Sequence, residues 1–315
     1  MSRNFGFGSR EMASAAAIAF KQSVDEGGHS FSTAATVCTR FERFVRFARD
    51  AGVGRLERVS PDIVQRFGEQ LADLVENDEM STAYAQNLVS AVNSVMTLMT
   101  RGDWSPVSPT VACRIRRRCH VRLTPPSGFD RELLQLGLDA VRQNGWNHGL
   151  LIAQLARDFG LRTKEAALLD ASAALREARV SKQVTVHFGT KGGRPRRIPI
   201  SNPRQLDSLS AAVLIQGKNR SLIPCDLSWK SFRAGELRWT RELLQRYGVT
   251  RLHELRASYA CERYITLSGY PPPVQGGKAP RELDAQVRQE VALELGHGRV
   301  DVTNSYLGGR RVYVD

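Results

Sequence analysis

The sequence predicts a mainly α-helical protein of the α+β class, organised in two domains. At 315 residues the chain is long enough for two domains with separate cores. Apolar residues recur at helical spacing through most of the chain, and one segment alternates in the manner of paired strands. A proline- and arginine-rich stretch interrupts this pattern. We therefore expect a helical domain at 1–103, a linker at 104–128 and a second domain at 129–315.

The composition is that of a folded, soluble chain. Hydrophobic residues make up 42% and charged residues 24%, which excludes a disordered polymer. No run of eighteen apolar residues occurs, so no membrane span is expected, and a membrane is not among the expected partners. The N-terminus lacks the apolar core and cleavage site of a secretory signal. We expect a cytoplasmic location, in the bacterial cytosol or nucleoid.

The chain is strongly basic. Lys and Arg total 45 against 32 Asp and Glu, which gives a formal net charge of +13. This excess favours a polyanionic partner, because cationic side chains neutralise phosphates and release counterions. Most of the excess is arginine, which binds phosphate in a bidentate manner. Nucleic acid is the expected partner, and the alternative is a basic protein of unrelated function.

The cysteines indicate neither a disulfide framework nor a metal site. Five scattered cysteines, an odd number, are typical of reduced thiols. Cys113, Cys119 and His120 lie close in sequence, but their spacing is not CxxC and no second ligand pair follows. We expect no metal ion and no other cofactor.

Four helices are predicted in the first domain. Ser60-Pro61-Asp62 is a helix start, with proline at the first helical position. The second helix presents arginines every three residues opposite an apolar face, and Arg40 and Arg43 are candidate DNA contacts. The alternative is a solvated face. The predicted helices span 9–25, 31–51, 60–76 and 82–100.

The predicted linker is basic. The segment RIRRRCHVR holds five arginines and no carboxylate. Such a linker could lie along a nucleic-acid backbone, with the two domains closing as a clamp. The alternative is a soluble tether. The candidate DNA contacts here are Arg114, Arg116, Arg117 and Arg118.

Helices again dominate the second domain. Gly160 is a predicted C-cap, which places Arg162 at a junction between two apolar helices. Glu165 is close enough in sequence to brace Arg162. The predicted helices span 130–143, 146–159, 205–216, 229–247 and 282–295, besides the one that begins near Thr250.

Two alternating segments, 183–188 and 196–200, predict a hairpin. Glycines flank Lys191 in its turn, so the lysine is presented at the tip. Arg194 and Arg196 make the hairpin basic and are further candidate DNA contacts. A lysine at a hairpin tip is alternatively just solvated.

Four more candidates come from the last sixty-five residues. His253 and Arg256 are three apart and share one face near a helix N-terminus, where free N–H groups favour an anion. A helix stops at Gly296, and His297 follows directly. Tyr306 lies nine residues later, so the two rings could face one cleft. A structural role for both rings is the alternative.

Together these residues suit metal-free attack on a phosphodiester. They offer two guanidiniums for phosphate oxygens, two imidazoles, an ammonium group and a phenol. No carboxylate cluster for a metal and no phosphate-cradling glycine loop accompany them. The set is Arg162, Lys191, His253, Arg256, His297 and Tyr306.

The segments that carry this set resemble the tyrosine recombinase (phage integrase) family. The resemblance covers 130–315, and the helical first domain matches the family's core-binding, SAM-like domain in architecture only. It implies a C-shaped clamp around double-stranded DNA. The matching segments are GLRTKEAALL, GTKGGRPRRIPI, LHELRASYA and ELGHGRVDVTNSY.

The resemblance implies a role for each residue. Tyr306 would attack the scissile phosphate and form a 3′-phosphotyrosyl link, leaving a free 5′-hydroxyl. Arg162 and Arg256 would bind the non-bridging oxygens. Bond energy would be kept in the protein–DNA ester, so neither metal nor ATP would be required.

Proton transfer would fall to the remaining three residues. His253 would accept the tyrosine proton, Lys191 would protonate the leaving 5′-oxygen, and His297 would hydrogen-bond the phosphate.

The chain departs from the family pattern twice. Arg256 and His297 are 41 residues apart, so 270–290 contains an insertion that could contact DNA or another subunit, or be a neutral decoration. Only nine residues follow Tyr306, which could supply a short strand but no helix to a neighbouring subunit. Tyr313 is a rival nucleophile, but its alternation with valines suits that strand.

We therefore expect a site-specific DNA recombinase, the integrase of a mobile element. Its partners would be double-stranded DNA, three further copies in a homotetramer on paired sites, and accessory DNA-bending proteins. The alternatives are relaxation of DNA like a type IB topoisomerase, a DNA-binding regulator with a silent catalytic site, and an RNA- or ribosome-associated protein.

Overall fold

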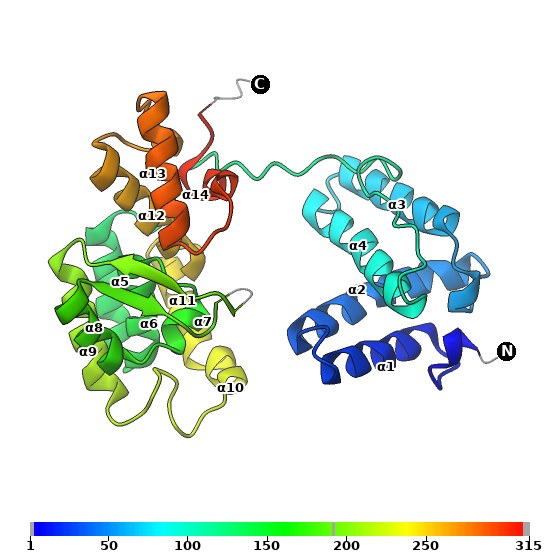
Figure 1. The fold of residues 1–315 in the computed structure, drawn as a ribbon, viewed down its shortest axis with the longest axis horizontal. Helices are drawn as coiled ribbons and strands as arrows, with labels where there is room; N and C mark the ends of the chain where they lie inside the picture. Colours follow the sequence, from blue (N-terminus) through cyan, green and yellow to red (C-terminus); the bar gives the residue numbers. More distant parts are fainter. Residues whose placement is uncertain (1–2, 191–192, 311–315) are drawn as a thin grey trace. The chain divides into compact units, whose positions relative to one another are not determined.

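The computed structural model describes residues 3–190 and 193–310, and the chain divides into two compact units, Met1–Cys119 and His120–Asp315. Each unit has its own hydrophobic core. The described residues form helices and one two-stranded sheet, and the predicted fold class, mainly α with a small sheet, is confirmed (Figure 1). No helix among these residues is long and apolar enough to cross a membrane.

The first unit is a bundle of four helices. Serine hydroxyls cap three of them by accepting a hydrogen bond from the backbone N–H three residues on, as Ser60 does from Ile63 at 3.4 Å. The predicted helices are confirmed to within a few residues. The helices are α1 (Met12–Asp25), α2 (Phe31–Asp50), α3 (Pro61–Glu76) and α4 (Thr82–Met99), with 3-10 turns η1 (Asn4–Gly6) and η2 (Leu56–Arg58).

Phenylalanine rings on α2 and α3 form the centre of the first core. Phe44 is fully buried and meets Phe67 edge-on, with ring centroids 5.4 Å apart. Phe41 and Phe47 flank it on the same helix. Aromatic pairs in this geometry add to the free energy that their buried area supplies, so the predicted apolar face of α2 fixes the bundle.

The structure places the first part of the predicted linker, residues 104–119, in the first unit. The Trp104 indole donates to the Asn93 Oδ1 at 3.0 Å, and Val107, Cys113 and Ile115 are buried in the first core. Residues 104–119 therefore belong to the first unit. The sequence did not predict this packing, because three apolar residues spaced six and two positions apart establish neither a helical nor a strand period.

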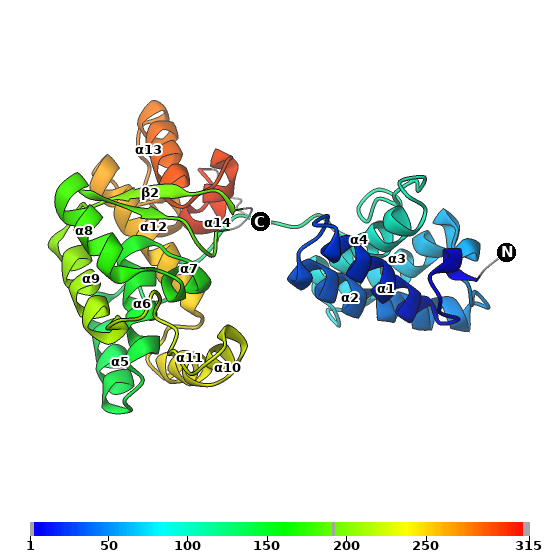
Figure 2. The ribbon, with the colours of Figure 1, turned by 60° about the horizontal axis from the view of Figure 1, so that its bottom comes forward.

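The second unit is built around the long helix α12, which packs against α6, α13 and α14. Strand β1 packs on α8 and β2 on α13, so the hairpin bridges the two (Figure 2). Its elements are α5 (Arg131–Gln143), α6 (Asn147–Phe159), α7 (Thr163–Ala167), α8 (Ala171–Ser181), β1 (Gln183–Val186), β2 (Arg196–Pro199), α9 (Pro203–Gln216), α10 (Trp229–Ala234), α11 (Glu236–Arg246), α12 (Leu252–Ser268), η4 (Pro273–Gln275), α13 (Arg281–Glu294), η5 (Val300–Thr303) and α14 (Asn304–Leu307).

Two elements differ from the sequence prediction. The helix α8 was not predicted, and the single helix expected over 229–247 is two helices that meet at Gly235. The hairpin is confirmed as an antiparallel pair in which Val184 faces Ile198, both buried. Alternation was a reliable indicator here because one face of the pair is packed against helices.

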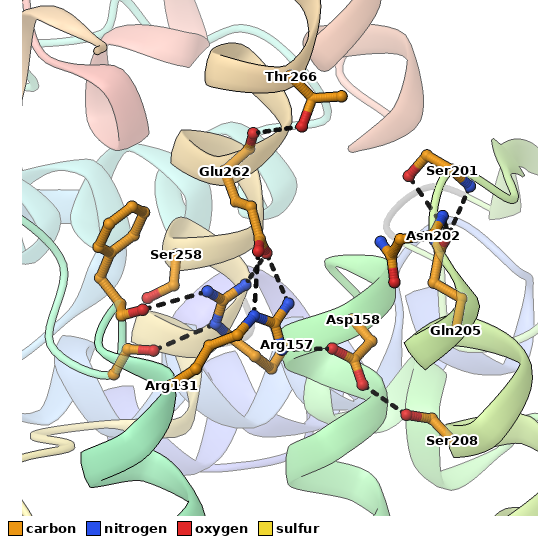
Figure 3. Close-up of polar contacts among 12 residues, drawn as sticks. Arg131, Arg157, Asp158, Ser201, Asn202, Gln205, Ser208, Ser258, Glu262 and Thr266 are labelled. Carbon is orange, nitrogen blue, oxygen red and sulfur yellow. Dashed lines mark hydrogen bonds and ion pairs between the residues drawn. The ribbon is translucent and has the colours of Figure 1, made fainter.

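A partly buried network of charges connects α12 to the helices around it (Figure 3). Glu262 accepts hydrogen bonds from Arg131 at 2.6 Å and Arg157 at 2.5 Å, and Arg131 also reaches Asp158 at 2.9 Å. Ser208 donates to the other oxygen of Asp158 at 2.5 Å. Since Arg157 is 2% exposed, burial lowers the pKa of its guanidinium. The network fixes α12 against α5, α6 and α9.

We predict that Phe44→Ala lowers the free energy of unfolding of the first unit by about 3–5 kcal/mol, through lost burial and the cavity left behind. Denaturant unfolding of the full chain, followed by circular dichroism and Trp104 fluorescence, measures this. The matched control is Phe31→Ala on the same helix, whose ring is 80% exposed and whose loss should cost less than about 0.5 kcal/mol. Equal costs would contradict this account of the core.

Candidate active site

The turn between α6 and α7 positions the first arginine. Gly160 ends α6 in the left-handed conformation, as predicted, and a Cβ there would lie 2.4 Å from the Tyr259 ring. Arg162 follows at the start of α7. Its backbone N–H and its Nη1 each donate to the Glu165 carboxylate at 2.6 Å, so the predicted brace is confirmed.

Glu165 does more than brace Arg162. Its carboxylate accepts two bonds from Arg196, at 2.7 and 2.6 Å, and lies 3.8 Å from the Arg256 Nη1. The residue is 1% exposed. Burial alone would raise its pKa, but the hydrogen bonds and charge of Arg196, followed by those of Arg162, lower it to about 2. One ionised carboxylate therefore holds three guanidiniums.

Arg196 was expected to contact DNA, and the structure places it differently. The residue is 7% exposed, and its Nε also donates to the backbone carbonyl of Glu294 at 2.8 Å. Every nitrogen of its guanidinium is thus occupied within the second unit. Arg196 acts as a brace between β2, Glu165 and the end of α13, because each of its guanidinium nitrogens is hydrogen-bonded to one of these parts of the second unit.

Arg256, on the second turn of α12, is fully buried. Its terminal nitrogens donate to the carbonyls of Gly160 and Leu295, and its Nε lies 3.4 Å from the Tyr306 hydroxyl. Burial lowers the pKa of Arg256 to about 10, which still leaves it protonated at neutral pH. The guanidinium is thereby fixed with one edge toward the tyrosine.

The two predicted histidines flank Tyr306. The His297 Nε2 lies 3.2 Å from the Tyr306 hydroxyl and 3.4 Å from the Arg256 Nη2. The His253 ring also lies near the tyrosine ring, with centroids 5.7 Å apart. Burial, followed by the charges of Arg256 and Arg162, lowers the pKa of His297 to about 4. His253 is open to solvent on one side, and partial burial followed by the Arg256 charge lowers its pKa as well.

Tyr306 lies on α14, a helix of one turn. Arg288 on α13 donates to the Asn304 side chain at 3.0 Å and to the Gly308 carbonyl at 2.9 Å. Asp284 in turn holds Arg288. The region predicted as an insertion, 270–290, thus contributes a structural anchor for α14 through α13, a role that sequence reasoning did not consider.

Arg162, His297 and Tyr306 border a cleft of about 1230 Å³. The structure brings together four predicted residues, Arg162, Arg256, His297 and Tyr306, with His253 beside them. The wall of the cleft is formed in part by Arg162, Arg194, Arg197, His297 and Tyr306.

Two predicted features lie outside the described residues. One is Lys191, at the hairpin tip, and the other is the terminal strand with Tyr313. Near the lysine, Gly189 has a positive φ of 74°, and a Cβ there would be 3.0 Å from backbone atoms of Lys164 and Glu165. The hairpin therefore approaches α7, where the arginine site begins.

The remaining DNA-contact candidates are on the first unit, apart from Arg194. Arg43, Arg114, Arg116 and Arg117 are exposed, whereas Arg40 and Arg118 are half-buried. Arg118 donates to the Asn87 Oδ1 at 2.9 Å. Within the described residues, no group of three or more His, Cys, Asp or Glu side chains could hold a metal ion.

We predict that Glu165→Gln destabilises the second unit by about 3–5 kcal/mol at neutral pH, because it leaves buried guanidiniums without their counter-charge. Since the pKa of Glu165 falls from an ordinary 4.5 to about 2, its stabilising effect is complete above pH 4.5 and is lost as pH drops through 2. The difference between wild type and variant in thermal melting should therefore shrink over that range. Glu242→Gln, at an exposed ion pair, is the control and should cost less than about 1 kcal/mol.

The second unit also matches a family model. The model, described as Integrase, matches residues 123–262, a range that contains Arg162 and Arg256 and ends before His297. A search of curated proteins finds no match to this chain.

Solved structures share the fold over nearly the whole chain. A lambda integrase tetramer bound to a Holliday junction is 15% identical, with a TM-score of 0.58, covering 94% of this chain and 77% of that chain. A variant of the Tn1549 transposon integrase in complex with transposon right end DNA is 14% identical, with a TM-score of 0.56, covering 93% and 95%. The chain thus shares its fold with these integrases, and residues 123–262 of its second unit match the Integrase family model.

Proposed function

We propose that the chain is a site-specific DNA recombinase that cleaves and rejoins strands through a 3′-phosphotyrosyl intermediate. The observation that carries this proposal is the position of the Tyr306 hydroxyl. It lies within 3.4 Å of the Arg256 guanidinium and 3.2 Å of the His297 imidazole. A phenol beside a fixed cation and a neutral base has what nucleophilic attack on a phosphodiester requires.

Charge stabilisation of the transition state is the task of the arginines. Arg256 is held by two carbonyls and by the nearby Glu165, and Arg162 by Glu165 directly. Both guanidiniums are therefore fixed before a phosphate arrives, which avoids reorganisation during the reaction. Removal of either should slow cleavage by roughly 10²–10³-fold, as loss of one oxyanion-hole donor does.

The tyrosine proton has two possible acceptors. We propose His253 in the DNA complex, because the His297 Nε2 is shared with Arg256, the proposed phosphate ligand, and is placed to contact the same phosphate. Both imidazoles have lowered pKa values and are neutral at pH 7. By resemblance to the family, Lys191 would protonate the leaving 5′-oxygen.

Double-stranded DNA is the proposed substrate, bound in a homotetramer on paired sites. Support comes from the net charge of +13, the exposed arginines of the first unit, and the DNA-bound tetramer of lambda integrase, which shares the fold. The chain would serve as the integrase of a mobile element, and accessory DNA-bending proteins would help to assemble the complex.

We predict that Tyr306→Phe abolishes covalent complex formation on nicked DNA that carries the element's site, because phenylalanine has no nucleophilic oxygen. Denaturing gels without added metal measure the protein–DNA band. The matched control is Tyr313→Phe, which should leave the band unchanged. A band that survives Tyr306→Phe and disappears in Tyr313→Phe would transfer the nucleophile to Tyr313. Tight binding without any band would favour a regulator, and relaxation of DNA with a single site would favour topoisomerase activity.

We predict that the single-turnover rate of this cleavage is constant near neutral pH and falls as pH drops through the lowered pKa of His253, below the ordinary 6.5. The sign follows because the base must be unprotonated. Rates between about pH 4.5 and 8 test this. In His253→Gln the rate should no longer decrease at low pH. In His297→Gln the rate should be lower at every pH but should still decrease at low pH. The opposite pattern would make His297 the proton acceptor.

A further inference from the structure

Arg122 is the last arginine of the basic segment 114–122, which leads into the second unit, and it is half-buried. Its side chain is 15% exposed, in contrast to Arg116 and Arg117, which are exposed. Its backbone N–H donates to the Asn304 carbonyl at 2.8 Å, and its Nε donates to the Ser305 carbonyl at 3.2 Å. Both acceptors are on α14, immediately before Tyr306.

The guanidinium of Arg122 also binds α12. Its two terminal nitrogens donate to the two oxygens of Glu254 at 2.9 and 2.8 Å, a bidentate pair. The Ser127 backbone N–H donates to the same carboxylate at 3.2 Å. Glu254 directly follows His253 in the first turn of α12. One side chain thus connects the nucleophile helix to the helix that carries His253 and Arg256.

A helix as short as α14 depends on such contacts. Four residues, Asn304–Leu307, cannot hold a helical turn without outside support. Arg288 holds the turn through the Asn304 side chain and the Gly308 carbonyl, and Arg122 holds it through the Asn304 and Ser305 carbonyls. The distance from the Tyr306 hydroxyl to Arg256, 3.4 Å, depends on this support.

We propose that Arg122 is a positioning residue for Tyr306, which couples the start of the second unit to the nucleophile. The proposal rests on the proposed function of Tyr306. The guanidinium is occupied by Glu254 and Ser305, so Arg122 acts through α14 and α12 rather than on DNA. Only two residues separate it from Cys119, the last residue of the first unit.

We predict that Arg122→Met slows single-turnover formation of the covalent complex at saturating DNA by about 10–100-fold, as a displacement of about 1 Å in a reacting group does. The affinity for DNA, measured with the same duplex, should change by less than about threefold, since one phosphate contact would weaken it more. Arg122→Lys should restore the rate in part, because lysine keeps the charge but not the bidentate fork.

The matched control is Arg131→Met. Like Arg122, Arg131 is partly exposed and binds α12 through a carboxylate. That carboxylate is the one of Glu262. None of its hydrogen bonds or ion pairs goes to α14. Arg131→Met should reduce thermal stability at least as much as Arg122→Met and leave the cleavage rate of the folded protein within about threefold of wild type, since Arg157 still holds Glu262 on α12 and the contacts of α14 are kept.

A second measurement does not need activity. Hydrogen exchange of the peptide 300–308 in the DNA-free full chain should be faster by at least tenfold in Arg122→Met and unchanged in Arg131→Met, because only the first change frees α14. If the wild type forms no covalent complex, the proposed function fails, and this exchange still decides the role of Arg122. Unchanged exchange, or a rate loss that saturating DNA restores, would overturn the positioning role.

Discussion

The rest of the site depends on the ion pairs that the Glu165 carboxylate forms with arginines. Guanidiniums repel one another and are costly to bury, so Arg162, Arg196 and Arg256 can converge only around a shared counter-charge. Glu165 supplies it from the first turn of α7, where the backbone N–H of Arg162 also stabilises its ionised form. The same contact joins three separate parts of the chain: the α6–α7 turn, the hairpin and α12.

Contacts from other segments fix the positions of Arg256 and Tyr306 around Glu165. Arg256 is fixed by carbonyls from the ends of α6 and α13. Tyr306 lies on a single helical turn that takes its order from Arg122 and Arg288. An active site assembled from distant segments gains its geometry from such supporting contacts, and both arginines that support α14, Arg122 and Arg288, lie outside the predicted catalytic set.

The two units are stabilised by different kinds of interaction. The first is held by an ordinary apolar core of phenylalanines and branched aliphatic residues. The second contains ion pairs as well as apolar groups, among them the buried pair of Arg196 and Glu165 and the partly buried network of Arg131, Arg157 and Glu262 that holds α12. Moving charged groups out of water costs free energy that their pairing only partly offsets. The ion pairs therefore fix the geometry of α12 more than they stabilise the second unit.

The sequence by itself determined most helices, the hairpin and the identity of the candidate site residues. These follow from local properties: apolar period, serine caps, glycine stops and motifs within a dozen residues. The tertiary structure alone decided what Arg196, Arg122 and Arg288 do, because the role of each depends on the carboxylates and carbonyls of distant segments that its guanidinium reaches. It likewise decided that residues 104–119 belong to the first unit, since their few apolar side chains follow no period and find their places only against the finished bundle.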